Sequence, residues 1–140
     1  MNHHPTLDGL PIEIVLLAAT LILAIVNLFW AANARTKQYG TKWNTGARDE
    51  ALPPIEPLPG RLLRAQANLM ETLPLFAAAV LAAAWAGRLG QLTGWGAHLY
   101  FFGRLAYLPL YAMGTPVVRT LVWLVSMVGL LMVIAGIFRG

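Results

Sequence analysis

The sequence contains no cysteine and few charged residues. With no Cys among 140 residues, disulfides, thiolate metal sites and a cysteine nucleophile are excluded, so any thiol chemistry must arrive with a ligand. Charged residues make up 11% of the chain and hydrophobic residues 58%, and the mean hydropathy is +0.62. This composition cannot cover a water-soluble surface with polar groups, and we expect an integral membrane protein whose main solvent is the lipid bilayer.

The sequence also lacks the motifs of common soluble activities. It has no Gly-rich phosphate loop and no nucleophile triad, and His3, His4 and His98 are not at metal-ligand spacing, so we expect no metal site. The net charge of +4 is compatible with nucleic-acid binding, but the basic residues lie mainly in one loop beside apolar segments. Membrane topology explains this distribution better, and we expect no nucleic-acid partner.

Four apolar segments have the length that a bilayer requires, roughly 20 residues per helix. They predict an all-α integral membrane fold, a four-transmembrane-helix bundle that forms a single domain over residues 1–140. The first segment is too long for a signal peptide and has no basic residue before it, so we expect it to be retained. The expected helices cover about residues 12–34, 62–87, 95–113 and 117–138, with a polar, Pro-rich loop at 36–60.

The basic residues predict the orientation of the bundle. The 36–60 loop and its borders hold Arg35, Lys37, Lys42, Arg48 and Arg61, whereas the N-terminus has neither Lys nor Arg. Because basic loops stay in the cytoplasm, we expect this loop to be cytoplasmic and both termini to lie outside.

Polar side chains form one stripe along the second expected helix. Arg61, Arg64, Asn68 and Glu71 follow spacings of 3, 4 and 3 residues, which places them on the same face. The guanidinium, amide and carboxylate groups suit a zwitterionic ligand that carries its own carboxylates and ammonium. The alternative is a polar clasp between helices. Both interpretations stay open, since ionisable groups in a membrane span are costly and often functional.

A second stripe follows the third expected helix, at Tyr100, Arg104, Tyr107 and Tyr111. Arg104 is predicted close to the bilayer centre, where facing lipid costs roughly 2.5–3.5 kcal/mol. We therefore expect it to turn inward in a structural role and to pair, or share a network, with Glu71. The hydroxyls of Tyr107 and Tyr111 are expected nearer the cytoplasm, either to meet a ligand or to form an interfacial aromatic belt.

Arg119 opens the last expected helix, where the helix macrodipole disfavours a cation. Two explanations remain open for this position. It is either a positive-inside anchor or part of a site for an anion.

Two runs of sequence resemble motifs of the MAPEG family, the membrane-associated proteins in eicosanoid and glutathione metabolism. The first is RLLRAQANLMETLPLF at residues 61–76, which contains the family's Arg-Ala-Gln-x-Asn-x-x-Glu-x-x-Pro. The second is LYFFGRLAYLPLY at residues 99–111, which is similar to the family's Tyr-x-x-x-Arg-x-x-Tyr-x-x-x-Tyr. With four spans of suitable length, the resemblance covers nearly the whole chain.

The resemblance implies a homotrimer of four-helix subunits with glutathione, the cosubstrate, held between subunits at the cytoplasmic side. It also implies that Arg119 stabilises the glutathione thiolate, although its distance from Tyr111 differs by about one residue from the family pattern. Arg35 resembles the arginine that a neighbouring subunit contributes. The glutathione-binding positions implied are Arg35, Arg64, Gln66, Asn68, Glu71, Tyr107 and Tyr111.

Two departures from the family pattern bear on the activity. Thr72 follows Glu71 where eicosanoid-type enzymes have a ligand-binding Tyr, and the 36–60 loop is longer than in the compact enzymes. They favour a bacterial-type microsomal glutathione transferase, or an inactive relative, over a specialised eicosanoid enzyme. We expect the protein in the bacterial inner membrane. We expect it to conjugate glutathione to lipophilic small-molecule electrophiles, with peroxidase as a related activity. The alternative is a non-catalytic MAPEG-like scaffold or accessory subunit that binds another membrane complex.

Overall fold

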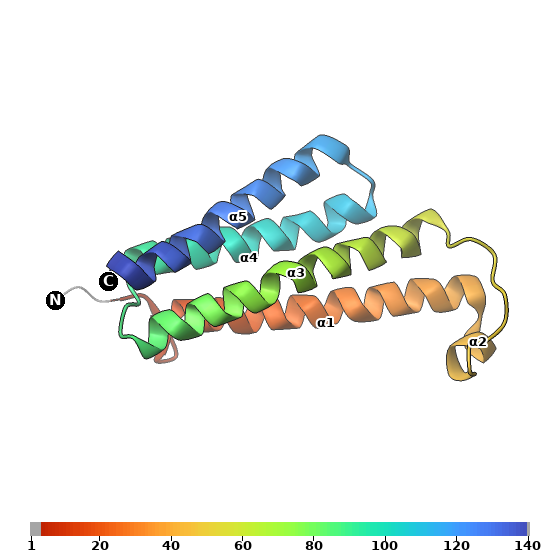
Figure 1. Ribbon diagram of the computed structural model, residues 1–140, viewed down its shortest axis with the longest axis horizontal. Helices are drawn as coiled ribbons and strands as arrows, with labels where there is room; N and C mark the ends of the chain where they lie inside the picture. The colour runs from red at the N-terminus through yellow and green to blue at the C-terminus, as the bar shows by residue number, and fades with distance from the viewer. Residues whose placement is uncertain (1–3, 140) are drawn as a thin grey trace.

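The computed structural model describes residues 4–139, which form a bundle of long helices (Figure 1). Residues 1–3, which include His3, and residue 140 lie outside the described part. The expected all-α class is confirmed, apart from a hairpin of two-residue strands before the first helix. In chain order the elements are β1 (Thr6–Leu7), β2 (Leu10–Pro11), α1 (Ile12–Tyr39), α2 (Thr41–Thr45), α3 (Pro57–Trp85), α4 (Gln91–Ala112) and α5 (Pro116–Arg139).

Helices α1 and α3 are longer than the apolar segments that predict them. They contain 28 and 29 residues, or roughly 42–44 Å at 1.5 Å per residue, whereas the hydrocarbon core of a bilayer is about 30 Å thick. Helix α1 continues past Ala34 to Tyr39 because Lys37 and Gln38 favour a helix in water as well. The expected loop at 36–60 is therefore shortened at both ends and contains the short helix α2.

Three helices of the described chain are long and apolar enough to cross a membrane: α1, α3 and α5. Helix α4 has 22 residues, which is sufficient length, but its sequence includes His98, Arg104 and three tyrosines. Its polar side chains are largely covered by protein, as Tyr100 is fully buried and Arg104 is 2% exposed. The chain is an integral membrane protein.

The long helices lie as two neighbouring pairs, α1 beside α3 and α4 beside α5, and α4 also contacts α1 and α3 (Figure 1). Both ends of the described chain lie at one end of the bundle, and α2 lies at the other. The pairs diverge toward the α2 end, where the α4–α5 turn is found.

Small residues let α4 and α5 approach closely at the other end. A Cβ atom at Gly96 would lie 2.6 Å from the backbone oxygen of Gly129, so neither position has room for a side chain. Small residues at a helix contact are typical of membrane bundles, where close packing replaces the hydrophobic effect as the driving force. In the adjacent core, Phe76 of α3 stacks on Tyr100 of α4 with ring centroids 4.0 Å apart. Helices α4 and α5 are thus packed most closely at this end.

A buried carboxylate that the sequence did not single out joins α1 to α4. Glu13 is fully buried, and its Oε1 accepts a hydrogen bond of 2.6 Å from the hydroxyl of Thr93. Its Oε2 lies 2.7 Å from Nε2 of His4. Along the same α1 helix, Asn27 donates from Nδ2 to the backbone oxygen of Leu62 at 3.2 Å. These bonds fix α1 against α4 and α3.

Candidate functional site

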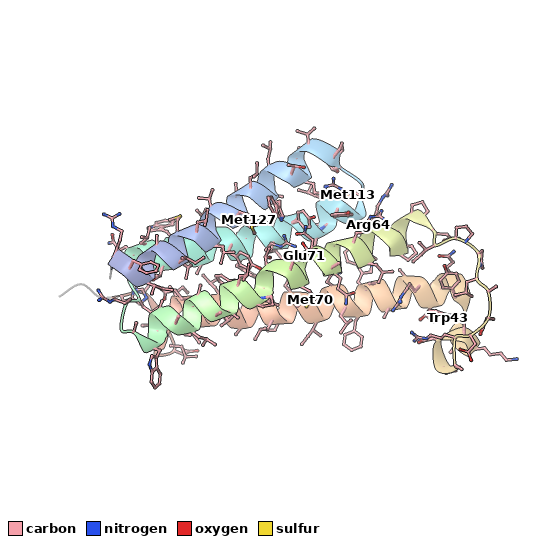
Figure 2. The ribbon with its side chains drawn as sticks, viewed as in Figure 1. Trp43, Arg64, Met70, Glu71, Met113 and Met127 are labelled. Carbon is pink, nitrogen blue, oxygen red and sulfur yellow. The ribbon has the colours of Figure 1, made fainter. Side chains whose placement is uncertain are left out.

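A cavity of about 250 Å³ lies between α3, α4 and α5 toward the α2 end of the bundle. Five of its seven lining residues are predicted site residues, and none of the seven is acidic. Figure 2 shows Arg64 on α3 at this end, with Met113 of the α4–α5 turn near it. The lining residues are Arg64, Asn68, Tyr107, Tyr111, Arg119, Thr120 and Trp123.

The Asn68 side chain is held by donors from two helices. Its Oδ1 accepts a hydrogen bond of 2.8 Å from Arg104 Nη1 on α4 and one of 3.0 Å from Trp123 Nε1 on α5. With the carbonyl oxygen taken, the amide group of Asn68 has its two N–H donors left for a ligand. Asn68 therefore offers donors to the cavity, and a ligand group beside it has to be an acceptor.

Arg104 is buried at the back of this site. Its guanidinium carbon lies 4.3 Å from the centroid of the Tyr107 ring, and its Nε is buried without a hydrogen-bond partner. The expected ion pair with Glu71 is not formed within residues 4–139, because Asn68 supplies the acceptor and Glu71 lies exposed on α3. Glu71 attracts Arg104 only electrostatically and without contact, which agrees with the second form of the expectation, a shared network. The positive charge of Arg104 thus has no carboxylate in contact with it.

Tyr111 lies between two arginines. Nε of Arg64 donates to the Tyr111 hydroxyl at 3.2 Å, and the guanidinium carbon of Arg119 lies 4.4 Å from the centroid of the Tyr111 ring. The Tyr107 ring meets the same ring edge-on at 5.5 Å. Arg64 comes from α3 and Arg119 from the first turn of α5, so Tyr111 of α4 links the three helices. The cavity consequently has two cations at its walls and a third, Arg104, behind it.

Arg61 joins the first turns of α3 to the end of α4. Its Nη1 donates to the backbone oxygen of Ala112 at 3.4 Å, which places a cation at the C-terminus of α4. Gly114 has a positive φ of 75°, and a Cβ there would lie 2.9 Å from the Arg61 guanidinium carbon. A glycine is therefore needed at this turn for Arg61 to reach the helix end.

Three predicted ligand residues lie away from the cavity. Gln66 and Glu71 are on α3 but do not line it, and Figure 2 shows Glu71 further along α3 from Arg64. Arg35, at the α2 end of α1, lies with its guanidinium carbon 5.9 Å from the centroid of the Trp43 ring. Its Nε is buried without a partner. A single chain therefore assembles part of the predicted set.

Thr72, which stands where a ligand tyrosine was expected from the family pattern, belongs to the core. It is 7% exposed, and its hydroxyl lies 2.9 Å from the hydroxyl of Tyr100. The Tyr100 side of the second stripe is thus structural, and only Tyr107 and Tyr111 reach the cavity.

Two lining residues were missed by sequence reasoning, Thr120 and Trp123. Trp123 follows Arg119 by four residues, so both lie on one face of α5. An indole N–H inside a membrane span also needs a hydrogen-bond acceptor, and this requirement could have placed Trp123 beside the polar residues of the site. Within residues 4–139, no three His, Asp or Glu side chains come together as a group that could hold a metal ion.

One comparison with known proteins gave a match. Residues 16–139, nearly the whole chain, match the sequence model of the MAPEG family. Neither the curated proteins nor the solved structures gave a match. The matched range contains all four long helices apart from the first turn of α1, and every residue that lines the cavity. The chain therefore belongs to the MAPEG family.

Proposed function

We propose that this protein is a membrane-bound glutathione transferase, with peroxidase as a related activity, that conjugates glutathione to apolar electrophiles. The observation that carries the proposal is the cavity bordered by Arg64, Arg119 and Asn68, in which every charged wall residue is a cation. Glutathione carries two carboxylates and one ammonium group and forms a thiolate, so it is an anion when it reacts. Charge-assisted hydrogen bonds to such groups are about twice as strong as neutral ones.

Arg119 is the residue that we propose activates the thiol. A free thiol has a pKa of about 8.5, and an adjacent arginine lowers that pKa by about 1–3 units. Arg119 lies in the first turn of α5, whose N-terminus adds positive potential to the same place. Asn68, Arg64 and Tyr111 would hold the tripeptide while the thiolate faces Arg119.

The site is proposed to be completed by a second subunit of a homotrimer. A volume of about 250 Å³ is below the roughly 300–1,000 Å³ that is usual for ligand pockets. Glu71 leaves a carboxylate exposed on a membrane helix, which is costly unless protein or ligand covers it. Arg35 lies at the same end of the bundle as the cavity, and its Nε is buried without a partner. In the proposed trimer, Arg35 of one subunit would reach the site of its neighbour.

We further propose that α4 crosses the membrane as the fourth span of a single domain over residues 1–140. Both ends of the described chain lie at one end of the bundle, which requires an even number of crossings (Figure 1). The basic segment between α1 and α3 would then lie in the cytoplasm, with both termini outside, in a bacterial inner membrane.

The electrophile is proposed to arrive from the lipid. Helix α5 exposes Val117, Leu121 and Leu124 next to the cavity wall formed by Thr120 and Trp123. An apolar substrate dissolved in the bilayer meets this apolar surface before it meets water. The second substrate then reaches the thiolate without leaving the membrane.

Glutathione titration of the purified protein in detergent tests the proposal. We expect millimolar glutathione to raise the unfolding temperature, because a ligand at 100 times its Kd stabilises the folded state by about 2.7 kcal/mol. The matched control is the analogue γ-glutamyl-alanyl-glycine, which should stabilise the protein similarly but cannot form a thioether. A chlorodinitrobenzene assay on the same sample then reports the transfer reaction itself.

The scaffold alternative gives a different result in the same experiment. No thermal stabilisation by either tripeptide would contradict the proposal and favour an accessory subunit. If glutathione stabilises the protein but no apolar electrophile is conjugated, the protein binds glutathione and is not a transferase. Arg64→Gln should weaken the stabilisation by both tripeptides, since it removes the donor beside Tyr111.

A further inference from the structure

A second cavity lies at the opposite end of the bundle from the proposed glutathione site. It has a volume of about 420 Å³ and is bordered by the α3–α4 turn, the start of α4 and the end of α5. Thr93 and Gly136, which lie where α4 and α5 pack closely, form part of its wall. The lining residues are Arg88, Gly90, Gln91, Leu92, Thr93, Trp95, Met132, Gly136 and Arg139.

The walls of this cavity divide into a cationic part and an apolar part. Arg88 and Arg139 contribute two positive charges, and no acidic side chain is among the described lining residues. Leu92, Trp95 and Met132 supply the apolar surface. Such a combination fits a ligand that has an anionic head and a hydrocarbon tail.

The depth of the cavity matches the headgroup region of a membrane. Arg119 and Arg139 flank the apolar run of α5 and are 20 residues apart, or roughly 30 Å, which is the thickness of the hydrocarbon core. Trp85 ends α3 and Trp95 lies near the start of α4, at the end of the bundle where α5 ends. They are 95% and 66% exposed, as is typical of interfacial aromatic residues. Met132 lies seven residues before Arg139, roughly 10 Å deeper along α5.

We propose that this cavity binds an acidic phospholipid of the leaflet opposite the proposed cytoplasmic loop. The phosphate would lie between Arg88 and Arg139, and the upper part of an acyl chain would lie against Leu92 and Met132. The headgroup should be acidic because the charged residues of the cavity wall are arginines. The ligand should be a lipid rather than a free anion because Met132 extends the cavity toward the hydrocarbon region. Lipid binding here does not depend on the glutathione proposal, because the two cavities share no residue, and only the choice of leaflet rests on the proposed topology.

Thermal unfolding of the full-length protein in a neutral detergent, with added lipid, tests this site. We expect phosphatidylglycerol to stabilise the protein at lower concentration than phosphatidylcholine does. Each arginine should account for about a fivefold difference in apparent Kd. Replacing both, in R88Q/R139Q, should abolish the preference. The matched control K37Q/K42Q removes two positive charges at the other end of the molecule and should keep it.

A second variant protects the test against loss of folding. Gln91 is exposed in the first turn of α4, where an acidic residue favours a helix, so Gln91→Glu should fold normally. It places a carboxylate at the mouth of the cavity and should also reduce the preference for phosphatidylglycerol.

Several outcomes would overturn the proposal. Equal stabilisation by the two phospholipids would show that the cavity binds lipid through its apolar surface alone, without selecting the headgroup. Inorganic phosphate acting as well as phosphatidylglycerol would make it a free-anion site. A preference that persists in both R88Q/R139Q and Q91E would show that acidic lipid binds elsewhere.

Discussion

Asn68 and Arg104 are joined across α3 and α4 by a hydrogen bond of 2.8 Å from Nη1 to Oδ1. Because Trp123 of α5 donates to the same oxygen at 3.0 Å, the orientation of the Asn68 amide is set by two other helices. The two N–H donors of the Asn68 amide are therefore already oriented before a ligand binds. In the proposed site, Asn68 contacts the ligand, Trp123 positions the Asn68 amide, and Arg104 supplies a buried positive charge. The contributions of Trp123 and Arg104 can be tested by substitution.

Trp123→Phe should weaken glutathione binding without unfolding the protein. The ring remains, but one of the two donors to Asn68 Oδ1 is lost, so that the amide is held by Arg104 alone. Loss of one hydrogen bond is worth about 0.5–1.5 kcal/mol, so we expect a two- to tenfold higher Kd. Trp85→Phe, at an almost fully exposed position on α3, is the matched control. Unchanged glutathione affinity together with an unchanged unfolding temperature would contradict a positioning role for Trp123.

Arg104→Leu should keep most of the stability and lose anion binding. A buried cation without a carboxylate partner is costly, and replacing buried charges by apolar groups is often neutral. Arg104→Ala should cost about 2–3 kcal/mol, because it leaves a cavity beside Tyr107. Unfolding temperature and glutathione Kd, measured on both variants, separate the effects. If Arg104→Leu is as unstable as Arg104→Ala, the hydrogen bond to Asn68 holds the fold.

The helical period made part of this site predictable. Residues three or four positions apart share a helix face, so the stripes on α3 and α4 could be written down from the sequence. The burial of Arg104 followed from the cost of polar groups in lipid. On this basis Arg64, Asn68, Tyr107 and Tyr111 were placed on two stripes, and the resemblance to the MAPEG family added Arg119. All five line the same cavity.

Partners across helices were not predictable in the same way. Glu71 was the expected partner of Arg104 on charge alone, but the contact is made by Asn68, because the rotation of α3 against α4 depends on the packing of the whole bundle. Glu13 and Thr93 are 80 residues apart, and no local pattern connects them. The ends of α1 and α3 differ from the expected ones for another reason. Hydropathy shows where a helix leaves the lipid, but the helix can continue into water.

Gly96→Ala should destabilise the contact between α4 and α5. The added Cβ would lie 2.6 Å from the Gly129 backbone oxygen and 2.9 Å from Met132 Cβ. Overpacking of this kind costs about 1–3 kcal/mol, which outweighs the gain of up to about 1 kcal/mol in helix propensity. Gly90→Ala is the control, because nothing lies within 4 Å of that Cβ. Similar unfolding temperatures for the two variants would contradict the close approach of the helices.

Thr93→Val should destabilise the protein through Glu13. The hydroxyl donates to the fully buried Glu13 carboxylate at 2.6 Å, and valine has the same shape without the donor. A buried acceptor that loses a partner costs about 1–3 kcal/mol. Thr36→Val is the control, since that hydroxyl bonds only the backbone oxygen of Ala32 in its own helix. The effect of Thr93→Val should shrink in a Glu13→Leu background, and equal effects in both backgrounds would disprove the coupling.

Arg119→Ala should lower turnover far more than glutathione affinity. Arg119 borders the cavity at the first turn of α5, and its proposed contribution is to stabilise the thiolate rather than to hold the tripeptide. Loss of one such charge-stabilising group typically lowers kcat by about 10²–10³-fold. Without the cation the thiol of bound glutathione has a higher pKa, so the rise of kcat with pH should move about 1–3 units upward. Arg119→Lys, which keeps the charge, should shift the profile less.

The separation of kcat from affinity decides the role of Arg119. Both are measured on one preparation, kcat from conjugation of chlorodinitrobenzene and Kd from glutathione-dependent thermal stability. Arg48→Gln removes a cation on the exposed segment after α2 and serves as the control for net charge. Equal losses in kcat and affinity, with an unshifted pH profile, would make Arg119 a binding residue only. In that case the thiol would have to be activated by Arg64 or by the N-terminus of α5, because these are the remaining positive groups at the cavity wall.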